Sequence, residues 1–142
     1  MTMATVEQSA VIPFTREDGE YKIVLVTAMT DRSWIVPKGH LEPDMSPAES
    51  AAKEALEEAG VTGRLYPEMI TQYGFDLKGK RILVDLFALE VDAILDDWDE
   101  KGERERRHVT LEEALELCPY EDIRKALRDL PEFVEKADEA NG

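Results

Sequence analysis

The sequence is poor in cysteine and in long apolar runs, and each shortage argues against a class of protein. The single cysteine, Cys118, cannot form a disulfide within the chain, and it lies in an apolar helical pattern typical of a core residue. We therefore expect a reducing compartment, most simply the cytoplasm. No apolar stretch approaches the roughly 18 residues that a membrane span requires, and the first thirty residues show no signal-peptide pattern. We expect no membrane partner.

Positive charge is also scarce. The chain has 17 basic against 32 acidic side chains, a formal net charge of -15 at pH 7. A protein that binds a nucleic-acid backbone needs a basic surface, so we expect no nucleic-acid partner. A small phosphorylated ligand is compatible with this charge if local basic side chains or a divalent cation offset the acidic field.

The order of the expected elements indicates one mixed domain over residues 1–142, of the α/β (α+β) class. Apolar, β-branched segments predict two hairpins, within residues 7–27 and 65–91, whose turns are the segments "REDGE" and "KGK". A short strand is expected at "WIVP" and another near residues 107–109, and residues 38–45 are expected to form a loop.

Capping signals predict the helices. Ser46 followed by Pro47, with Glu49 three residues after Ser46, is typical of a helix start, and Gly60 of a helix end. Thr110 is expected to cap a helix over residues 111–118. Further helices complete the chain, with residues 131–142 expected as a fraying helical tail.

The helix that begins at Ser46 carries three acids on one face. Glu54, Glu57 and Glu58 fall within an arc of about 100°, opposite a small apolar face rich in alanine. One interpretation is a solvated acidic face. The other is a metal site, because magnesium typically takes one or two carboxylates together with substrate phosphates. The preceding loop offers the Lys38 ammonium group and the Gly39 carbonyl oxygen, which suits a metal-bridged phosphate substrate.

The segment from Gly39 to Val61 resembles the signature box of the Nudix hydrolases. That box is glycine, five residues, glutamate, seven residues, arginine-glutamate, an apolar residue, any residue, two glutamates, any residue, glycine and an apolar residue. The matching positions here are Gly39, Glu54, Ala55, Glu57, Glu58, Gly60 and Val61. Two positions depart, because Met45 stands at the first glutamate and Lys53 at the arginine.

The resemblance implies an α/β/α sandwich with a mixed β-sheet between helices, and an enzyme that hydrolyses a diphosphate bond with Mg²⁺ or Mn²⁺. It implies Glu54, Glu57 and Glu58 as catalytic residues and metal ligands, with Gly39 adding a backbone oxygen. In the family the first glutamate and the arginine orient the metal-binding glutamates. The two departures therefore predict a slower enzyme unless Glu42 or Asp44 compensates.

The surrounding sequence narrows the substrate. The stretch "DRSWIVPKGHLEP" resembles diadenosine polyphosphate hydrolases and diphosphoinositol polyphosphate phosphohydrolases, so the resemblance implies one of these substrates or a related nucleoside diphosphate derivative. The lysines of the "KGKR" hairpin tip have an alternative role in solubility and edge protection. The resemblance also leaves a homodimer open. The predicted substrate-binding residues are Arg32, Lys38, His40, Lys78, Lys80 and Arg81.

Two other functions compete with this interpretation. The departures at Met45 and Lys53 also fit a Nudix-like module that binds a phosphorylated ligand with weak or no catalysis. An acidic helical interaction protein would explain the charge, but it would leave the spacing from Gly39 to Val61 unexplained.

Overall fold

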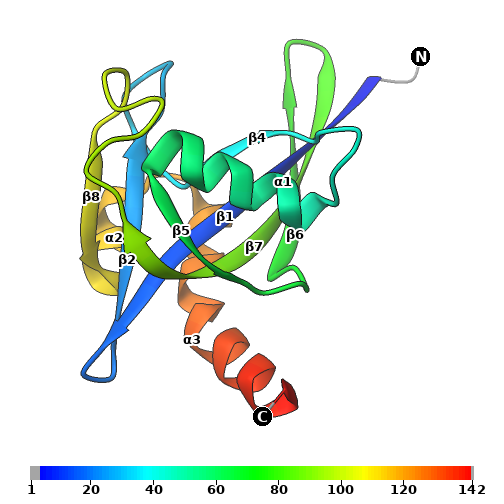
Figure 1. The fold of residues 1–142 in the computed structure, drawn as a ribbon. Coiled ribbons are helices and arrows are strands. Elements are labelled where there is room, and N and C mark those ends of the chain that lie inside the picture. The colour runs from blue at the N-terminus through cyan, green and yellow to red at the C-terminus, as the bar shows by residue number, and fades with distance from the viewer. Residues whose placement is uncertain (1–3, 142) are drawn as a thin grey trace.

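A computed structural model describes residues 4–141, which fold around one eight-stranded mixed sheet (Figure 1). The order of the main strands is β3-β2-β1-β7-β5, with β4 paired to β1, β6 to β7 and β8 to β2. The long strands β1 and β7 run parallel at the centre, and all other pairs are antiparallel. The strands are β1 (Ala4–Glu17), β2 (Glu20–Thr27), β3 (Trp34–Ile35), β4 (Lys38–His40), β5 (Val61–Leu65), β6 (Thr71–Leu77), β7 (Lys80–Ile94) and β8 (Arg106–Thr110).

Helices cover both faces of this sheet. Along β1, Val11 packs on one face with the alanines of the first helix, whereas Ala10 and Ile12 pack on the other face with the C-terminal helices. The predicted α/β/α sandwich is therefore confirmed. None of the described helices combines the length and apolarity needed to cross a membrane. The helical segments are α1 (Pro47–Glu54), its π-helical continuation η1 (Ala55–Ala59), α2 (Leu111–Leu117) and α3 (Glu121–Asn141).

Both predicted hairpins form, but two strand predictions were wrong. Residues 38–45, expected as a loop, contain β4, which pairs with β1. The second hairpin, expected from residue 65, starts only at Thr71, because β5 ends at Leu65 and β6 begins after a break. Pro67 lies in the break between them, where it has no ladder hydrogen bond to donate. The missed strand β4 matters most, because it brings the segment around Gly39 next to the centre of the sheet.

The first helix begins as its sequence predicts. The Ser46 hydroxyl accepts a hydrogen bond from the Glu49 backbone at 3.1 Å, and the Glu49 carboxylate accepts one from the Ser46 backbone at 3.0 Å. The helix ends at Ala59, and Gly60 follows with a φ of 64°, a conformation that favours glycine. The π-helical turn η1, which the sequence did not predict, carries Glu57 and Glu58.

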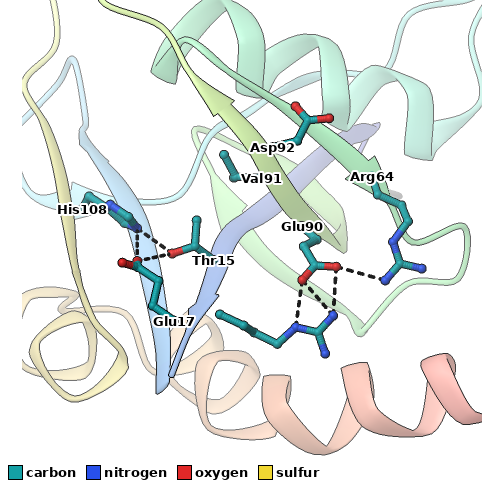
Figure 2. Close-up of a pocket in the computed structure, with 8 residues that line it drawn as sticks. Thr15, Glu17, Arg64, Glu90, Val91, Asp92 and His108 are labelled. Atoms are coloured by element: carbon teal, nitrogen blue, oxygen red, sulfur yellow. Dashed lines mark hydrogen bonds and ion pairs between the residues drawn. The ribbon is translucent and has the colours of Figure 1, made fainter. Parts of the chain in front are cut away.

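The far end of α3 is tied to the sheet. The Asp138 carboxylate accepts hydrogen bonds from Tyr66 at 2.9 Å, from Arg64 at 3.0 Å and from Arg16 at 3.0 Å. Arg16 and Arg64 also share Glu90, which Figure 2 shows reaching toward Arg64. Residues 131–141 are helical as part of α3, and the predicted fraying of the tail over residues 131–142 stays a prediction. Residues 1–3 and 142 lie outside the described part.

Asp138 makes the docking of α3 dependent on pH. Desolvation opposes the effect, but the hydrogen bonds from Tyr66, Arg64 and Arg16 hold the pKa of Asp138 below its ordinary value. A carboxyl with a lowered pKa stabilises the fold above its unfolded pKa of about 3.9, and this contribution is lost as the pH falls through the folded pKa.

We predict that Asp138→Asn lowers the midpoint of thermal unfolding at pH 7 and that the difference from wild type shrinks as the pH falls below about 3.9 toward the lowered pKa of folded Asp138. The control is Asp129→Asn, because Asp129 lies on the same helix and makes only an exposed ion pair with Lys125. Thermal melts followed by circular dichroism between pH 2.5 and 8 measure both variants. Equal melting of the two variants at pH 7 would show that α3 is not held by Asp138.

Candidate active site

Two of the three predicted carboxylates meet at the junction of α1 and η1. Glu54 ends α1 and Glu58 lies in η1, where it is only 4% exposed. The two carboxyl groups share a hydrogen bond. Burial raises the pKa of Glu58 to about 8, against the opposing charge of Arg104, and burial also raises the pKa of Glu54. The pair therefore holds a proton that a divalent cation would replace.

Strand β4 presents its backbone directly to this pair. A Cβ atom on Gly39 would lie 2.4 Å from the Glu54 carboxyl carbon, so only glycine leaves room for that carboxylate. The backbone N–H of Lys38 donates a hydrogen bond to Glu58 at 3.2 Å. Pairing with Ser9 of β1 fixes Gly39 in the sheet. The carboxyl pair is therefore held between a helix and a strand that cannot move independently.

This donor set suits a hard divalent cation. Within residues 4–141, no group of three or more His, Cys, Asp or Glu side chains is arranged to hold a metal. Mg²⁺ does not need such a group, because it commonly takes one or two carboxylates and completes its shell with water and substrate phosphates. Glu54, Glu58 and the Gly39 carbonyl oxygen would supply the protein's share. The space that Gly39 leaves against the Glu54 carboxylate is consistent with that role.

The third predicted carboxylate, Glu57, is engaged by Lys53. The Lys53 ammonium nitrogen lies 2.7 Å from the Glu57 carboxylate and 3.3 Å from that of Glu42. The hydrogen bond to Glu57, with a smaller contribution from Glu42, raises the pKa of Lys53. Glu42 therefore supplies the carboxylate partner of Lys53 that Met45, which has no carboxylate, cannot supply. Of the two residues predicted to compensate, the structure favours Glu42, while Asp44 is exposed.

A cavity of about 620 Å³ opens beside the carboxyl pair. Glu58, Lys38 and Arg104 form its polar side. The Lys38 ammonium nitrogen lies 5.2 Å from the centre of the Phe75 ring, and burial lowers the pKa of Lys38 although Glu58 opposes this effect. The remaining lining is mainly apolar and aromatic: Gln8, Ala28, Met29, Thr30, Ile35, Tyr73, Phe75, Leu77, Tyr120, Asp122 and Ile123.

The aromatic side of the cavity has two features that suit a flat ligand. The rings of Tyr73 and Phe75 lie 6.5 Å apart with an angle of 23° between their planes, on one face of β6. The side-chain oxygen of Gln8 is buried at the same cavity and has no hydrogen-bond partner among residues 4–141. A buried acceptor without a donor is costly, so a ligand that donates a hydrogen bond would be favoured there.

The structure brings only one of the predicted substrate-binding residues into the cavity. That residue is Lys38. Arg32 instead donates to the backbone oxygen of Glu103 at 2.7 Å, and His40 is exposed on β4. The hairpin-tip residues lie just beyond Leu77, which lines the cavity, but none of them lines it. They are Lys78, Lys80 and Arg81.

Several cavity residues were not among those predicted from the sequence. Tyr73 and Phe75 are two residues apart on one strand, and this alternation could have shown that they share a face. Arg104 belongs to a charged loop whose conformation no local pattern indicates. Gln8 precedes an apolar strand segment, and Tyr120 starts the C-terminal helical region, so neither carries a recognisable signal.

Comparisons with known proteins show which family this chain resembles. A family model described as the NUDIX domain matches residues 6–131. Nudix hydrolase 12, mitochondrial, of Arabidopsis thaliana is 35% identical over 122 residues, covering 80% of this chain and 60% of the relative. Diphosphoinositol polyphosphate phosphohydrolase 2 of Rattus norvegicus is 28% identical over 113 residues, covering 78% of this chain and 62% of the relative.

Solved structures show the same fold. A crystal structure of a C. elegans Ap4A hydrolase binary complex superposes with a TM-score of 0.73, covering 92% of this chain and 98% of that chain at 21% identity. The chain spans about 60% of the length of the curated relatives described above. The family model covers most of the chain, and the box residues Gly39, Glu54 and Glu58 meet in the structure. The chain therefore belongs to the Nudix hydrolase family.

Proposed function

We propose that this chain is a hydrolase that uses Mg²⁺ or Mn²⁺ to cleave a diphosphate bond in a small phosphorylated substrate. The observation that carries the proposal is the Glu54–Glu58 pair, in which Glu58 is buried and Glu54 lies against Gly39, at the wall of a cavity that Lys38 also lines. The family membership supports it, and the named relatives include hydrolases of diphosphoinositol polyphosphates and of Ap4A.

Each residue has a role that follows from its position. Glu54, Glu58 and the Gly39 carbonyl would hold a divalent cation, with Glu57 as a further ligand oriented by Lys53. The cation would supply the charge that neutralises the diphosphate and promotes ionisation of the attacking water. Glu58 lines the cavity and is therefore placed to accept the proton of that water. Lys38 faces the cavity and would pair with phosphate oxygens. Water adds to one phosphorus, and the bridging oxygen leaves with the other phosphate.

The cavity lining favours a nucleoside polyphosphate, such as a dinucleoside polyphosphate, as the substrate. Tyr73 and Phe75 offer an aromatic surface for a base, and Gln8 offers an unpartnered acceptor for one of its N–H groups. A diphosphoinositol polyphosphate is the second candidate, because the hairpin-tip cations Lys78, Lys80 and Arg81 lie next to cavity residue Leu77. It would depend on those cations, since Lys38 and Arg104 are the basic residues lining the described cavity.

The alternative of a binding module without catalysis rested on Met45 and Lys53. The contacts of Lys53 weaken that alternative. Glu42 holds the Lys53 ammonium group, and Lys53 in turn holds Glu57, so the orientation of Glu57 does not require a glutamate at position 45. A cytoplasmic location and a homodimer stay predictions. The absence of a nucleic-acid partner also stays a prediction, which the net charge of -15 supports.

We predict that Glu58→Gln and Glu54→Gln each lower kcat at least about 100-fold, because glutamine neither binds a cation as a carboxylate does nor accepts a proton. Glu116→Gln, an exposed change on α2, is the matched control and should retain wild-type turnover. The assay follows product formation from a dinucleoside polyphosphate and a diphosphoinositol polyphosphate with Mg²⁺. Wild-type turnover by both site variants would contradict the proposed chemistry. Thermal stabilisation by the ligands with no product from wild type would favour the binding module.

We predict that Gly39→Ala lowers kcat about 100-fold, since the new methyl group would displace the Glu54 carboxylate from a position that must be accurate to within about 1 Å. Gly102→Ala is the control, because a methyl group there would meet no atom within 4 Å. Steady-state kinetics and melting curves with and without Mn²⁺ compare the two. If Gly39→Ala retained the rate and the Mn²⁺ response of the control, catalysis would not depend on the position of the Glu54 carboxylate against β4.

We predict that Glu42→Gln lowers kcat about 10 to 100-fold, the usual effect of removing a residue that orients a metal ligand. Asp44→Asn is the control, because Asp44 is an exposed acid two residues away. The double variant Glu42→Gln plus Met45→Glu should recover part of the loss by supplying Lys53 with a carboxylate from the other position. An unchanged rate in Glu42→Gln would show that Lys53 orients Glu57 without Glu42.

A further inference from the structure

The segment that follows β7, together with the first residue of β8, closes over the end of the glutamate-bearing helix. We call this segment, residues 95–106, the clasp. The last carbonyl groups of a helix have no partner within it. Here the clasp supplies those partners. The Glu100 backbone N–H donates to the Glu57 oxygen at 3.1 Å, and that of Leu95 donates to the Gly60 oxygen at 2.8 Å. The helix end that carries Glu57 is therefore hydrogen-bonded to a segment almost forty residues later in the sequence.

An arginine and a tryptophan complete this contact. The Arg106 guanidinium group donates to the Ala59 oxygen at 2.9 Å and to the Leu95 oxygen at 2.8 Å. Its central carbon lies 4.0 Å from the centre of the Trp98 ring. The tryptophan in turn covers Gly60, where a Cβ atom would come within 2.8 Å of the Trp98 side chain. Arg106 thus connects the helix end, the clasp backbone and the indole ring.

Arg104 extends the clasp from the helix backbone to a catalytic carboxylate. Its side chain is only 11% exposed, and it donates to the Thr27 oxygen at 2.9 Å and to the Glu100 carboxylate at 2.7 Å. Its remaining nitrogen lies 3.6 Å from the Glu58 carboxylate. Two of its contacts therefore fix the guanidinium on β2 and within the clasp, and the third directs it at Glu58.

We propose that the clasp sets the position of the metal-binding carboxylates, with Arg106 fixing the backbone beneath Glu58 and Arg104 fixing its side chain. Both are positioning residues that lie outside the box from Gly39 to Val61. The inference rests on the proposed function. A planar guanidinium is required in each case, because lysine cannot donate in two fixed directions or stack in the same way.

The test compares Arg106→Lys and Arg104→Lys with Arg107→Lys. Arg107 is the matched control, because it lies on β8 next to Arg106 and its guanidinium is 5.8 Å from the Trp34 ring, yet it makes no contact with η1 among the contacts described. We expect kcat to fall about 10 to 100-fold in both site variants, with KM changed less than about threefold in Arg106→Lys. The control should match wild type in both constants.

Direct Mn²⁺ binding, followed by electron paramagnetic resonance of the free ion, supplies a readout that does not need turnover. The dissociation constant should rise about 10 to 100-fold in Arg106→Lys and Arg104→Lys. Trp98→Phe keeps an aromatic face for Arg106 and should bind Mn²⁺ nearly as wild type, whereas Trp98→Ala should resemble Arg106→Lys. Melting curves verify that each variant is folded. Trp98→Phe and the lysine variants change the side-chain volume least, so they are the variants most certain to fold.

The possible results separate the two proposals. Wild-type Mn²⁺ affinity and kcat in Arg106→Lys and Arg104→Lys would overturn the role of the clasp and leave the metal site intact. Failure of the wild-type chain to bind Mn²⁺ would overturn the metal site itself, and the clasp's role with it. A loss of Mn²⁺ affinity in Arg106→Lys, Arg104→Lys and Trp98→Ala, but not in Arg107→Lys or Trp98→Phe, would establish that the clasp positions the metal-binding carboxylates.

Discussion

The site depends on keeping two carboxyl groups close together, with one of them almost fully shielded from water. Isolated in solution, Glu54 and Glu58 would separate, because two negative charges on neighbouring helical turns repel each other. Here α1, η1 and β4 leave them no room to separate, and Glu58 is almost fully buried. The raised pKa of Glu58 is the sign of this constraint. Positive charge would relieve the repulsion between the two groups, and the proposed metal chemistry rests on this.

The rest of the fold serves this constraint. Alanines on the buried side of α1 and η1 bring the helix close to the sheet, since larger side chains would hold it further away. Strands β1 and β7 form the central parallel pair. Strand β4 pairs with β1 and strand β6 pairs with β7, so the carboxyl pair and the aromatic side of the cavity are attached to the same central strands. On the opposite face, α2 and α3 complete the core, and Asp138 ties the last turns of α3 to β1 and β5.

Local patterns in the sequence accounted for the helix, its capping box, its terminal glycine and both hairpins. These features depend on residues close together in the chain, such as Ser46 with Glu49, and local chemistry decides them. Strand β4 was missed because three residues are too few to show a strand pattern. The strand forms only through its pairing with β1, which lies far away in the sequence. The cavity residues were missed for the same reason. Gln8, Phe75 and Arg104 are far apart in the chain, and the tertiary fold alone brings them together.

The contact of Lys53 with Glu42 changes how the two departures from the box are to be interpreted. Taken position by position, Met45 and Lys53 are two separate losses. In the structure they belong to one unit, because the flexible lysine stem reaches a carboxylate three residues before the usual place. We therefore expect the effects of substitutions at residues 42, 45 and 53 to depend on one another, because the three positions share a single lysine-centred ion pair.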